Sequence, residues 1–326
     1  MVKVGILGLG RYLPSKKLTN SDLEKMVDTS DEWIRTRTGI KERRIAALHE
    51  KTSDLATKAA LSALRDAKIS AEKIDLIVVA TISPDSNFPS MACKVQKAIR
   101  AHKAAAFDVS AACSGYLFAL TTAKQYIQTG LAKRALVIAA ERISGLIDWK
   151  NRDTCVLFGD GAGACVLGPV KSGGILADFL QAFGAQGDLM QVIAPEARSP
   201  FHPAKAAYTQ LPYVQMKGQE LFKVAVNSMA DAVEKVLKKA KIKKTQVDWI
   251  VPHQANDRII SAVANKLGVP KKKIFINIDK YGNMSAASIA VALYEAKKSK
   301  KIKKGDKVVL VTFGAGLVSA ANLIKW

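Results

Sequence analysis

Asp75-Leu-Ile-Val-Val-Ala80 recurs as Asp248-Trp-Ile-Val-Pro-His253, 173 residues further along the chain. Ala67-Lys-Ile69 recurs as Ala240-Lys-Ile242 at the same offset. The identities are few, but chance does not readily produce one constant offset across so long a stretch. The second half therefore overlays the first without a gap, and the sequence predicts a duplicated α/β unit.

Each copy of the unit shows the same alternation of amphipathic helical patterns and short apolar runs typical of strands. In the first copy we expect helices at 53–68, 90–99 and 114–129 and strands at 74–80, 105–109 and 135–140. In the second we expect helices at 219–240, 256–267 and 285–298 and strands at 247–251, 274–278 and 307–313. This alternation predicts sheets covered by helices on both faces. The proline-rich segment 188–212 is interpreted as a linker or an excursion between the halves.

Cys113 lies in Phe107-Asp-Val-Ser-Ala-Ala-Cys-Ser-Gly-Tyr116, where a strand-like run gives way to a helical pattern. Its neighbours are small, so an incoming substrate would meet little bulk. A thiol at a helix N-terminus feels the positive end of the helix dipole, and we expect its pKa to fall. Backbone N–H groups there also stabilise an oxyanion. A buried, inert cysteine is the commoner fate in an apolar stretch, so this segment alone leaves both interpretations open.

The repeat supplies candidate partners for Cys113. Its equivalent in the second half is Ala286, at the start of the matching helix, and Asn283 lies just before that helix. His253 ends the first strand of the second half. Taken singly, His253 could be a satisfied structural histidine and Asn283 a turn residue. If the halves pack about a pseudo-twofold axis, these junctions converge, which favours one shared functional site.

The chain is strongly basic, with 50 Lys and Arg against 28 Asp and Glu in 326 residues and a net charge of +22. The lysines cluster at 238–244, 271–273 and 297–307, beside predicted helices and turns, which is typical of solvated faces. A nucleic-acid-binding protein therefore stays a remote alternative. Such a surface would attract an acidic protein or a polyphosphate ligand.

Several other classes of protein and site are not expected. No apolar run is long enough for a membrane span, and four cysteines without a Cys-x-x-Cys pair suggest a reducing cytoplasm. The four histidines have no metal-ligand spacing, so no metal site is predicted. The segment 8–13 lacks the third glycine of a dinucleotide loop and is followed by Pro14. Gly159-Asp-Gly-Ala-Gly-Ala164 lacks the lysine of a phosphate-binding loop and is interpreted as a tight strand junction.

Five motifs occur in family order along the chain: Asp31-Glu-Trp-Ile-Arg-Thr-Arg-Thr-Gly-Ile40, Ala111-Ala-Cys-Ser-Gly115, Phe158-Gly-Asp-Gly-Ala-Gly163, Val251-Pro-His-Gln-Ala-Asn256 and Gly282-Asn-Met-Ser-Ala-Ala287. Together they resemble the β-ketoacyl-acyl-carrier-protein synthase III family of thiolase-fold condensing enzymes. The resemblance implies a five-layered α-β-α-β-α architecture, with halves at 1–172 and 173–326. It also implies a coenzyme A thioester as substrate, no metal or redox cofactor, a malonyl-bearing acidic acyl-carrier protein as partner, and a homodimer.

The resemblance also implies roles for particular residues. Cys113 would be the nucleophile, with His253 and Asn283 completing a triad, and Gly314, Ala315 and Gly316 would form the oxyanion loop. The coenzyme A contacts would be Trp33, Arg37, Arg152, Gly218 and Asn256. The carrier-protein contacts would be Gln254, Ala255, Asn256, Asp257 and Arg258. Phe88 would reach across the dimer into the partner's acyl pocket.

The implied reaction is a decarboxylative condensation of a short acyl-CoA with malonyl-carrier protein through an acyl-Cys113 intermediate, which starts fatty-acid synthesis. A related condensing or acyl-transfer enzyme of secondary metabolism is the alternative. Three departures from the family pattern stand out. Ala315 replaces a usual glycine, Leu317-Val-Ser-Ala320 lacks a Trp-Gly pair, and Asp257 adds a negative charge to the docking segment.

Overall fold

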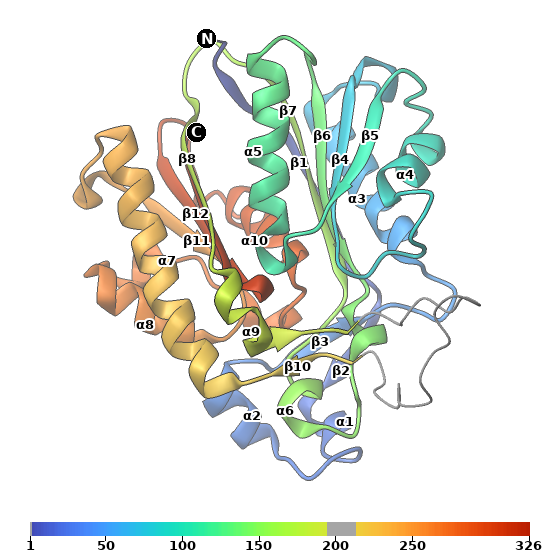
Figure 1. Cartoon of the computed structure of the whole chain (residues 1–326), viewed down its shortest axis with the longest axis vertical. Helices are drawn as coiled ribbons and strands as arrows, with labels where there is room; N and C mark the ends of the chain where they lie inside the picture. The colour runs from blue at the N-terminus through green and yellow to red at the C-terminus, as the bar shows by residue number, and fades with distance from the viewer. Residues whose placement is uncertain (1, 194–212) are drawn as a thin grey trace.

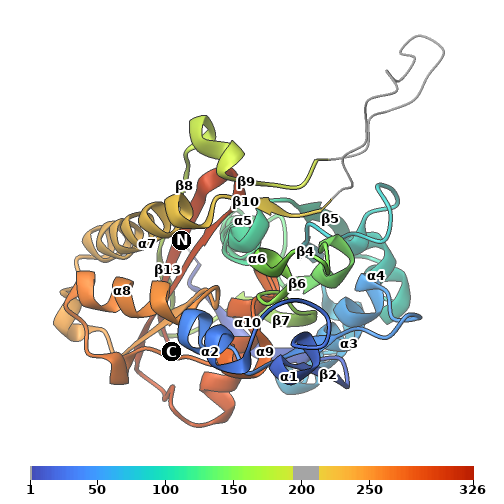
Figure 2. The ribbon, with the colours of Figure 1, turned by 90° about the horizontal axis from the view of Figure 1, so that it is seen from below.

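The computed structural model describes residues 2–193 and 213–326, so the expected excursion at 188–212 lies largely outside the described residues. Two large sheets stand side by side, with helices between them and on both outer faces (Figure 1). A smaller group of helices and short strands lies at one end of both sheets. Figure 2 views the molecule from that end.

The first sheet has the strand order β1-β7-β6-β4-β5. Its strands are β1 (Val4–Tyr12), β4 (Leu76–Ala80), β5 (Ala105–Val109), β6 (Ala135–Glu141) and β7 (Gly161–Pro169). Strand β4 is parallel to both of its neighbours, β5 and β6, whereas β7 is antiparallel to both β6 and β1. The edge strands of this sheet are β1 and β5.

The second sheet repeats this arrangement, with the order β11-β12-β13-β8. Its strands are β8 (Gly174–Ala182), β11 (Trp249–Pro252), β12 (Lys307–Gly314) and β13 (Val318–Lys325). β11 is parallel to β12, and β13 is antiparallel to β12 and β8, as their counterparts are in the first sheet. The strand predicted at 274–278 is wrong. Only Ile274 bridges to Ile250 there, and a short helix, α9 (Ile278–Tyr281), follows.

Three layers of helices cover the two sheets. The outer layers are α3 (Thr52–Ala67) with α4 (Met91–Ile99), and α7 (Gly218–Ala240) with α8 (Asp257–Leu267). The layer between the sheets is α5 (Gly115–Gln128) with α10 (Ala286–Lys298), and it packs on the inner face of each sheet (Figure 1). The five-layered α-β-α-β-α fold is therefore confirmed.

Close approach of backbones explains the glycine-rich stretches. A Cβ on Gly10 would lie 2.2 Å from the Ala63 nitrogen of α3, so β1 can lie against that helix only through glycine. A Cβ on Gly163 would lie 2.5 Å from the Ala290 side chain of α10. The interpretation of 159–164 as a tight strand junction is confirmed, since β7 begins at Gly161.

The duplication holds for the sheets but is not gapless. The segment 81–90 separates β4 from α4, whereas 253–256 is all that separates β11 from α8. The first half thus carries a longer loop, with Phe88 on it, where the second half carries His253. The strands of the first sheet all precede residue 172 and those of the second all follow it. We propose the boundary between the halves there.

The smaller group of elements closes the end of the sheets at which β5, β11 and β12 stop. It contains α1 (Asn20–Leu23), α2 (Asp31–Thr38), α6 (Arg152–Cys155), the hairpin of β2 (Lys16–Thr19) and β3 (Glu42–Ile45), and the pair β9 (Met190–Gln191) and β10 (Gln215–Met216). A separate apolar cluster around Ile34, Ile40 and Phe158 holds this group together. It therefore frames the site without belonging to either sheet.

Candidate active site

Cys113 lies on a single turn, Ala112–Ser114, that joins β5 to α5. Ala112 before it has φ +44, a left-handed conformation that costs energy for a non-glycine residue and fixes the direction of the turn. The Cys113 side chain is buried, and this burial raises the pKa of its thiol to about 12. The expected fall in pKa is therefore wrong in the resting structure, because loss of water outweighs the favourable end of the helix.

His253 follows β11 directly, and its backbone N–H donates to the Val311 carbonyl at 2.8 Å. This bond continues the pairing of β11 with β12 and holds the imidazole at the end of the sheet. Burial lowers the pKa of His253 to about 3, so the ring is neutral near pH 7. Its Nδ1 has no hydrogen-bond partner among the described residues.

Asn283 is fixed by bonds on its main chain and its side chain. Its N–H donates to the Leu157 carbonyl at 2.8 Å, and its carbonyl accepts from Gly159 at 3.0 Å. Its Oδ1 accepts from the Ser285 backbone N–H at 2.9 Å. Since the oxygen of the amide is occupied in this way, the NH₂ group is left to donate into the cavity.

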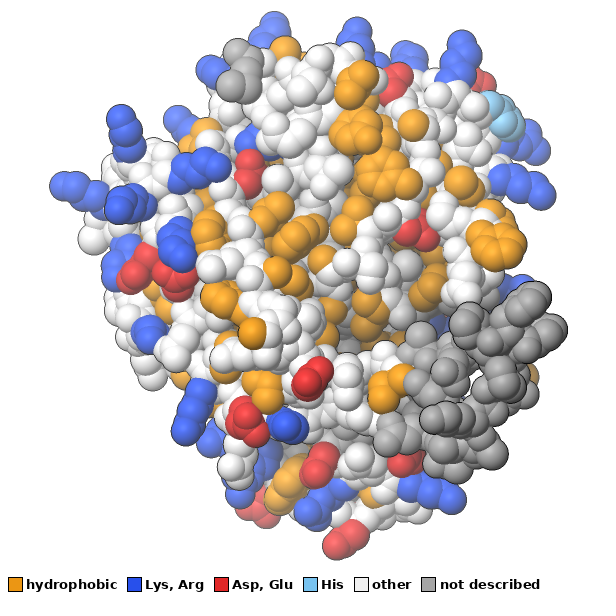
Figure 3. Space-filling view, viewed as in Figure 1, with side chains coloured by type: hydrophobic (Ala, Val, Ile, Leu, Met, Phe, Trp, Pro, Cys, Tyr) orange, Lys and Arg blue, Asp and Glu red, His pale blue; other side chains and the backbone are white. Residues whose placement is uncertain are grey.

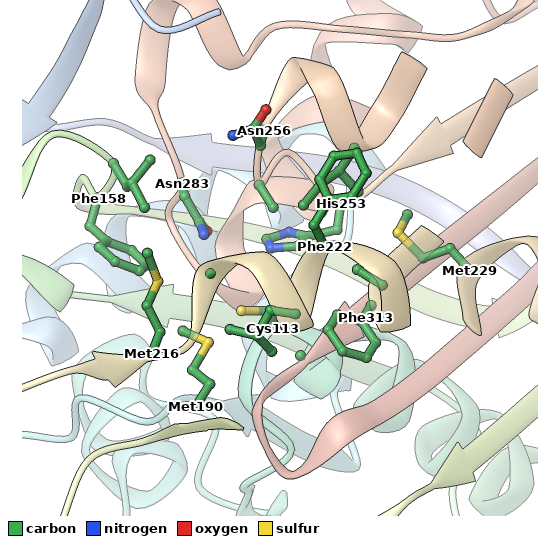
Figure 4. Close-up of a pocket in the computed structure, with 17 residues that line it drawn as sticks. Cys113, Phe158, Met190, Met216, Phe222, Met229, His253, Asn256, Asn283 and Phe313 are labelled. Carbon is green, nitrogen blue, oxygen red and sulfur yellow. The ribbon is translucent and has the colours of Figure 1, made fainter. Parts of the chain in front are cut away.

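Cys113, His253 and Asn283 line one cavity of about 160 Å³, with their polar atoms directed toward a common space (Figure 4). Gly218, Ala255, Asn256 and Gly314 line it as well. Its remaining wall is apolar: Leu157, Phe158, Met190, Met216, Leu221, Phe222, Ala225, Met229, Ile259 and Phe313. The convergence predicted from the repeat is thus present. Sequence reasoning did not identify this apolar wall, whose members come from separate elements.

A second cavity of about 750 Å³ meets the first at Cys113. Ser285 and Ala315 line this cavity together with Cys113, and Ile143, Leu146 and Val214 form part of its apolar wall. Cys113 therefore lines both cavities, so a group carried on its sulfur can occupy one while a second molecule enters the other.

The loop 314–316 lies against the backbone of Cys113. A Cβ on Gly314 would lie 2.7 Å from the Cys113 nitrogen, so only glycine permits this approach. Gly316 and Leu317 have positive φ, but Ala315 does not. The alanine in place of a usual glycine is therefore accommodated without backbone strain. Leu317, which stands where the Trp-Gly pair was missing, is fully buried in the core of the second half.

Trp33, Arg37 and Arg152 lie outside the lining of both cavities. Trp33 and Arg37 are on α2, and Arg152 begins α6. The Arg152 guanidinium carbon lies 4.9 Å from the centroid of the Trp33 ring. A planar base between them needs about 7 Å, which is two van der Waals separations. The two side chains therefore touch each other in this structure and would have to part to hold an adenine.

The predicted docking segment is only partly exposed. Gln254 is buried, its amide donates to the Pro252 and Phe275 carbonyls, and its oxygen accepts from the Asn277 N–H. This corrects the prediction of a direct carrier-protein contact for Gln254, which serves instead to fix the loop. The Asp257 carboxylate lies 3.3 Å from Lys271 Nζ, so its charge is partly neutralised. Arg258 is exposed.

Phe88 is 86% exposed and lines neither cavity of its own chain.

Two polar residues that sequence reasoning did not single out lie near Cys113, namely Glu141 and Ser285. The only signal for Glu141 was a charged residue directly after the apolar run 135–140. Ser285 lies within the motif at 282–287, but the sequence assigned no function to its side chain.

Within the described ranges, no group of three or more His, Cys, Asp and Glu residues could hold a metal ion. None of the helices in those ranges is long and apolar enough to cross a bilayer.

The fold and the paired cavities define a thiolase-fold condensing enzyme. The family model for 3-oxoacyl-[acyl-carrier-protein] synthase III matches residues 107–184, and the model for the C-terminal part of the same family matches residues 237–326. The chain is 52% identical to the β-ketoacyl-[acyl-carrier-protein] synthase III of Caldanaerobacter subterraneus over 100% of this chain and 98% of that protein.

Two solved structures agree with this. The 3-oxoacyl-[acyl-carrier-protein] synthase III of Aquifex aeolicus superposes with a TM-score of 0.91 at 50% identity, covering 99% of this chain and 100% of that one. The synthase III of Thermus thermophilus superposes with a TM-score of 0.93 at 44% identity, covering 99% of each chain. The chain belongs to the β-ketoacyl-acyl-carrier-protein synthase III family and is an acyl-transferring enzyme.

Proposed function

We propose that this enzyme condenses a short acyl-CoA with malonyl-acyl-carrier protein and so starts fatty-acid synthesis. The observation that carries the proposal is the meeting of Cys113, His253 and Asn283 at one cavity, with a second cavity that Cys113 also lines. The acyl group occupies the larger cavity once it is bound to Cys113. The smaller cavity admits the thioester arm of each substrate.

In the first half-reaction the Cys113 sulfur attacks the acyl-CoA thioester, and coenzyme A leaves. The tetrahedral intermediate carries an oxyanion. Donors for it are the Cys113 N–H and an N–H of the loop 314–316, which lies against Cys113. Because the resting thiol is protonated, its proton must leave as the sulfur–carbon bond forms.

In the second half-reaction malonyl-carrier protein loses CO₂, and negative charge develops on its thioester oxygen. The NH₂ group of Asn283 and the N–H of neutral His253 donate to that oxygen. The resulting carbanion attacks the acyl carbonyl on Cys113, and a 3-ketoacyl-carrier protein leaves. No cofactor is required for any of these steps.

For substrate binding we assign the nucleotide of coenzyme A to the surface formed by Trp33, Arg37 and Arg152, with Gly218 and Asn256 along its arm. The acidic carrier protein docks on Ala255, Asn256, Asp257 and Arg258 at the start of α8. Exposure of Arg258 and the net charge of +22 support this assignment. Gln254 is left out because it is buried.

We also propose a homodimer, with β5 and the loop 81–90 in the interface. β5 is an edge strand of the first sheet, and the exposed Phe88 lies on the loop before α4. Figure 3 shows apolar side chains gathered on the face that α5 and β5 present. The rings of Phe107 on β5 and Tyr126 on α5 pack together, with their centroids 5.9 Å apart. Covering this face would bring Phe88 to the partner's acyl cavity.

The four cysteines are free, which supports a cytoplasmic location.

Intact-mass spectrometry after incubation with a panel of acyl-CoAs tests the proposal. We expect a mass gain of one acyl group for short chains, located at Cys113 by peptide mapping and absent from Cys113→Ala. Subsequent addition of malonyl-carrier protein should remove that group and release a 3-ketoacyl product. Acylation at another residue, or a product that forms normally with Cys113→Ala, would contradict the proposal.

A further inference from the structure

Glu141 is a carboxyl group buried at the end of β6, close to the Cys113 thiol and without a positively charged partner among the described residues. Its Oε2 accepts from Thr81 Oγ1 at 3.1 Å, from the Ile82 N–H at 3.1 Å and from Ser83 Oγ at 2.6 Å. Its Oε1 has no partner among those residues. A buried acid held rigidly through one oxygen, with the other left open, needs a functional explanation.

Ser285 lies between this carboxyl group and Cys113. Burial raises the pKa of the thiol and that of Glu141, and the Ser285 hydroxyl opposes this rise in both, so it lies beside both groups. It nevertheless makes no hydrogen bond of good geometry within the described part of the chain, although Ser285 is only 1% exposed. The unsatisfied oxygens of Ser285 and Glu141 therefore lie together, beside the sulfur.

The backbone of Ser285 is also unusual. It has φ +48 and ψ −129, a region that glycine adopts freely and other residues avoid. The backbone of Ser285 is therefore strained, and its hydroxyl makes no structural hydrogen bond among the described residues that would explain the strain. Such strain is found where a side chain is positioned for a task.

We propose that Ser285 and Glu141 form a relay that takes the proton of Cys113 when the sulfur is acylated and returns it when the condensed product leaves. This inference rests on the proposed function and adds to it the destination of the thiol proton. Ser285 lies beside the reacting sulfur, whereas Glu141 acts through Ser285.

Each step of the relay balances. During acylation the S–H bond breaks, its proton passes to Ser285 Oγ, and the serine proton passes to Glu141 Oε1. The sulfur electrons form the bond to the acyl carbon, and coenzyme A leaves as a thiolate that takes a proton from water. During condensation Cys113 leaves as a thiolate and recovers its proton by the reverse path. One proton is consumed overall, as the loss of CO₂ from a malonyl carboxylate requires.

The chemistry of the carboxyl group suits this role. Burial raises the pKa of Glu141 to about 7, so it can accept and release a proton near neutral pH. The neutral imidazole of His253 is a weaker acceptor, because its burial lowers its pKa to about 3. Glu141 is therefore the better base beside Cys113.

The relay is tested with Glu141→Gln, which keeps an acceptor for Thr81, Ile82 and Ser83 but cannot take up a proton. Single-turnover acylation by acetyl-CoA, followed by quenched-flow mass spectrometry, should slow about 100-fold, the lower end of the range for a positioned proton acceptor. The acetyl-CoA concentration for half-saturation should not change. Ser285→Gly, which removes the hydroxyl and suits φ +48, should give the same loss.

Alkylation by iodoacetamide separates the relay from the proposed function, since it needs no acyl-CoA. Peptide mapping should show slower alkylation of Cys113 in both variants, with the exposed Cys93 of the same molecules reacting at the wild-type rate. Acylation and alkylation within twofold of wild type in both variants would overturn the relay, as would a change in half-saturation alone or an equal slowing at Cys93. Wild-type protein that is not acylated at all would remove the proposed function, and the relay with it.

Discussion

Asn283 Oδ1 accepts a hydrogen bond of 2.9 Å from the backbone N–H of Ser285, and this bond orients the Asn283 amide. The oxygen faces the strained turn and the NH₂ group faces the cavity of Cys113 and His253. The turn that positions Ser285 beside the sulfur thus also presents the amide donor. One short segment therefore positions groups for both half-reactions.

Asn283→Asp is expected to impair decarboxylation and spare acylation. The carboxylate can still accept from Ser285 but has no N–H to offer, and its charge repels the developing enolate. Loss of one such donor lowers the rate by about 100- to 1,000-fold. Release of CO₂ from malonyl-carrier protein and the mass of acyl-Cys113 measure the two steps separately. An equal fall in the rates of acylation and decarboxylation would contradict a role for Asn283 in decarboxylation alone.

Malonyl decarboxylation should not decline between pH 8 and pH 5. Burial lowers the pKa of His253 to about 3, so the ring stays neutral over this whole interval. A histidine with its ordinary pKa near 6.5 would be mostly protonated at pH 5, and a step needing the neutral ring would slow more than tenfold. CO₂ release by Cys113→Ala isolates this step from acylation. A fall centred near pH 6.5 would show that the ring titrates normally.

Glu141→Gln should become more stable relative to wild type as the pH rises. Burial raises the pKa of Glu141 from 4.5 to about 7, so the folded state holds a proton that the unfolded state has released over this interval. The cost to folding is absent below about pH 4.5, grows toward pH 7 and is complete above it, at roughly 3 kcal/mol. Urea unfolding of both proteins at pH 5 and pH 8 measures the change. A difference that is equal at the two pH values would contradict the raised pKa.

The sequence was sufficient to predict the two sheets, because apolar runs such as 76–80 and 135–140 leave little choice but buried strands. It also placed Cys113, His253 and Asn283 at equivalent junctions, since strand and helix ends follow from periodicity. The prediction of a strand at 274–278 failed because a run rich in Ile and Phe favours a strand, but a strand forms only where a neighbouring strand pairs with it. The carrier-protein contact predicted for Gln254 failed because its partners are backbone groups at the end of β11 and in the segment 275–277, which the sequence does not place beside it.

The protonation of Cys113 could not be predicted from its position at a helix end. The helix dipole is a local property, whereas burial depends on residues distant in sequence. Glu141 and Ser285 lie 28 and 172 residues beyond Cys113, and only the packing of β6 against the turn before α10 brings them together. The constant offset pairs Ser285 with Ala112 and Glu141 with Gly314, but it does not bring the Ser285 hydroxyl to the Glu141 carboxyl group.

Trp33→Ala should weaken the binding of acyl-CoA without slowing the chemistry. Trp33 now lies against Arg152, and an adenine would replace that contact with stacking on both sides. Loss of one stacking surface corresponds to about 1 kcal/mol or more, so the KM for acyl-CoA should rise roughly five- to tenfold at unchanged kcat. Acyl-pantetheine, which lacks the nucleotide, is the matched control and should show no difference between the two proteins. A rise in KM for both substrates would place Trp33 near the thioester arm instead.

Gly314→Ala should inactivate acylation even though its backbone conformation suits alanine. Gly314 has φ −155, which any residue adopts, but its new Cβ would lie 2.7 Å from the Cys113 nitrogen and 3.1 Å from the Cys113 Cβ. The loop 314–316 would have to move away, and it would take its oxyanion donor with it, so we expect a loss of at least 100-fold in acyl transfer. Gly184→Ala is the matched control, because an added Cβ there meets nothing within 4 Å. Rapid-quench mass spectrometry of acyl-Cys113 reports both variants, and normal acylation by Gly314→Ala would show that the loop takes no part in holding the oxyanion.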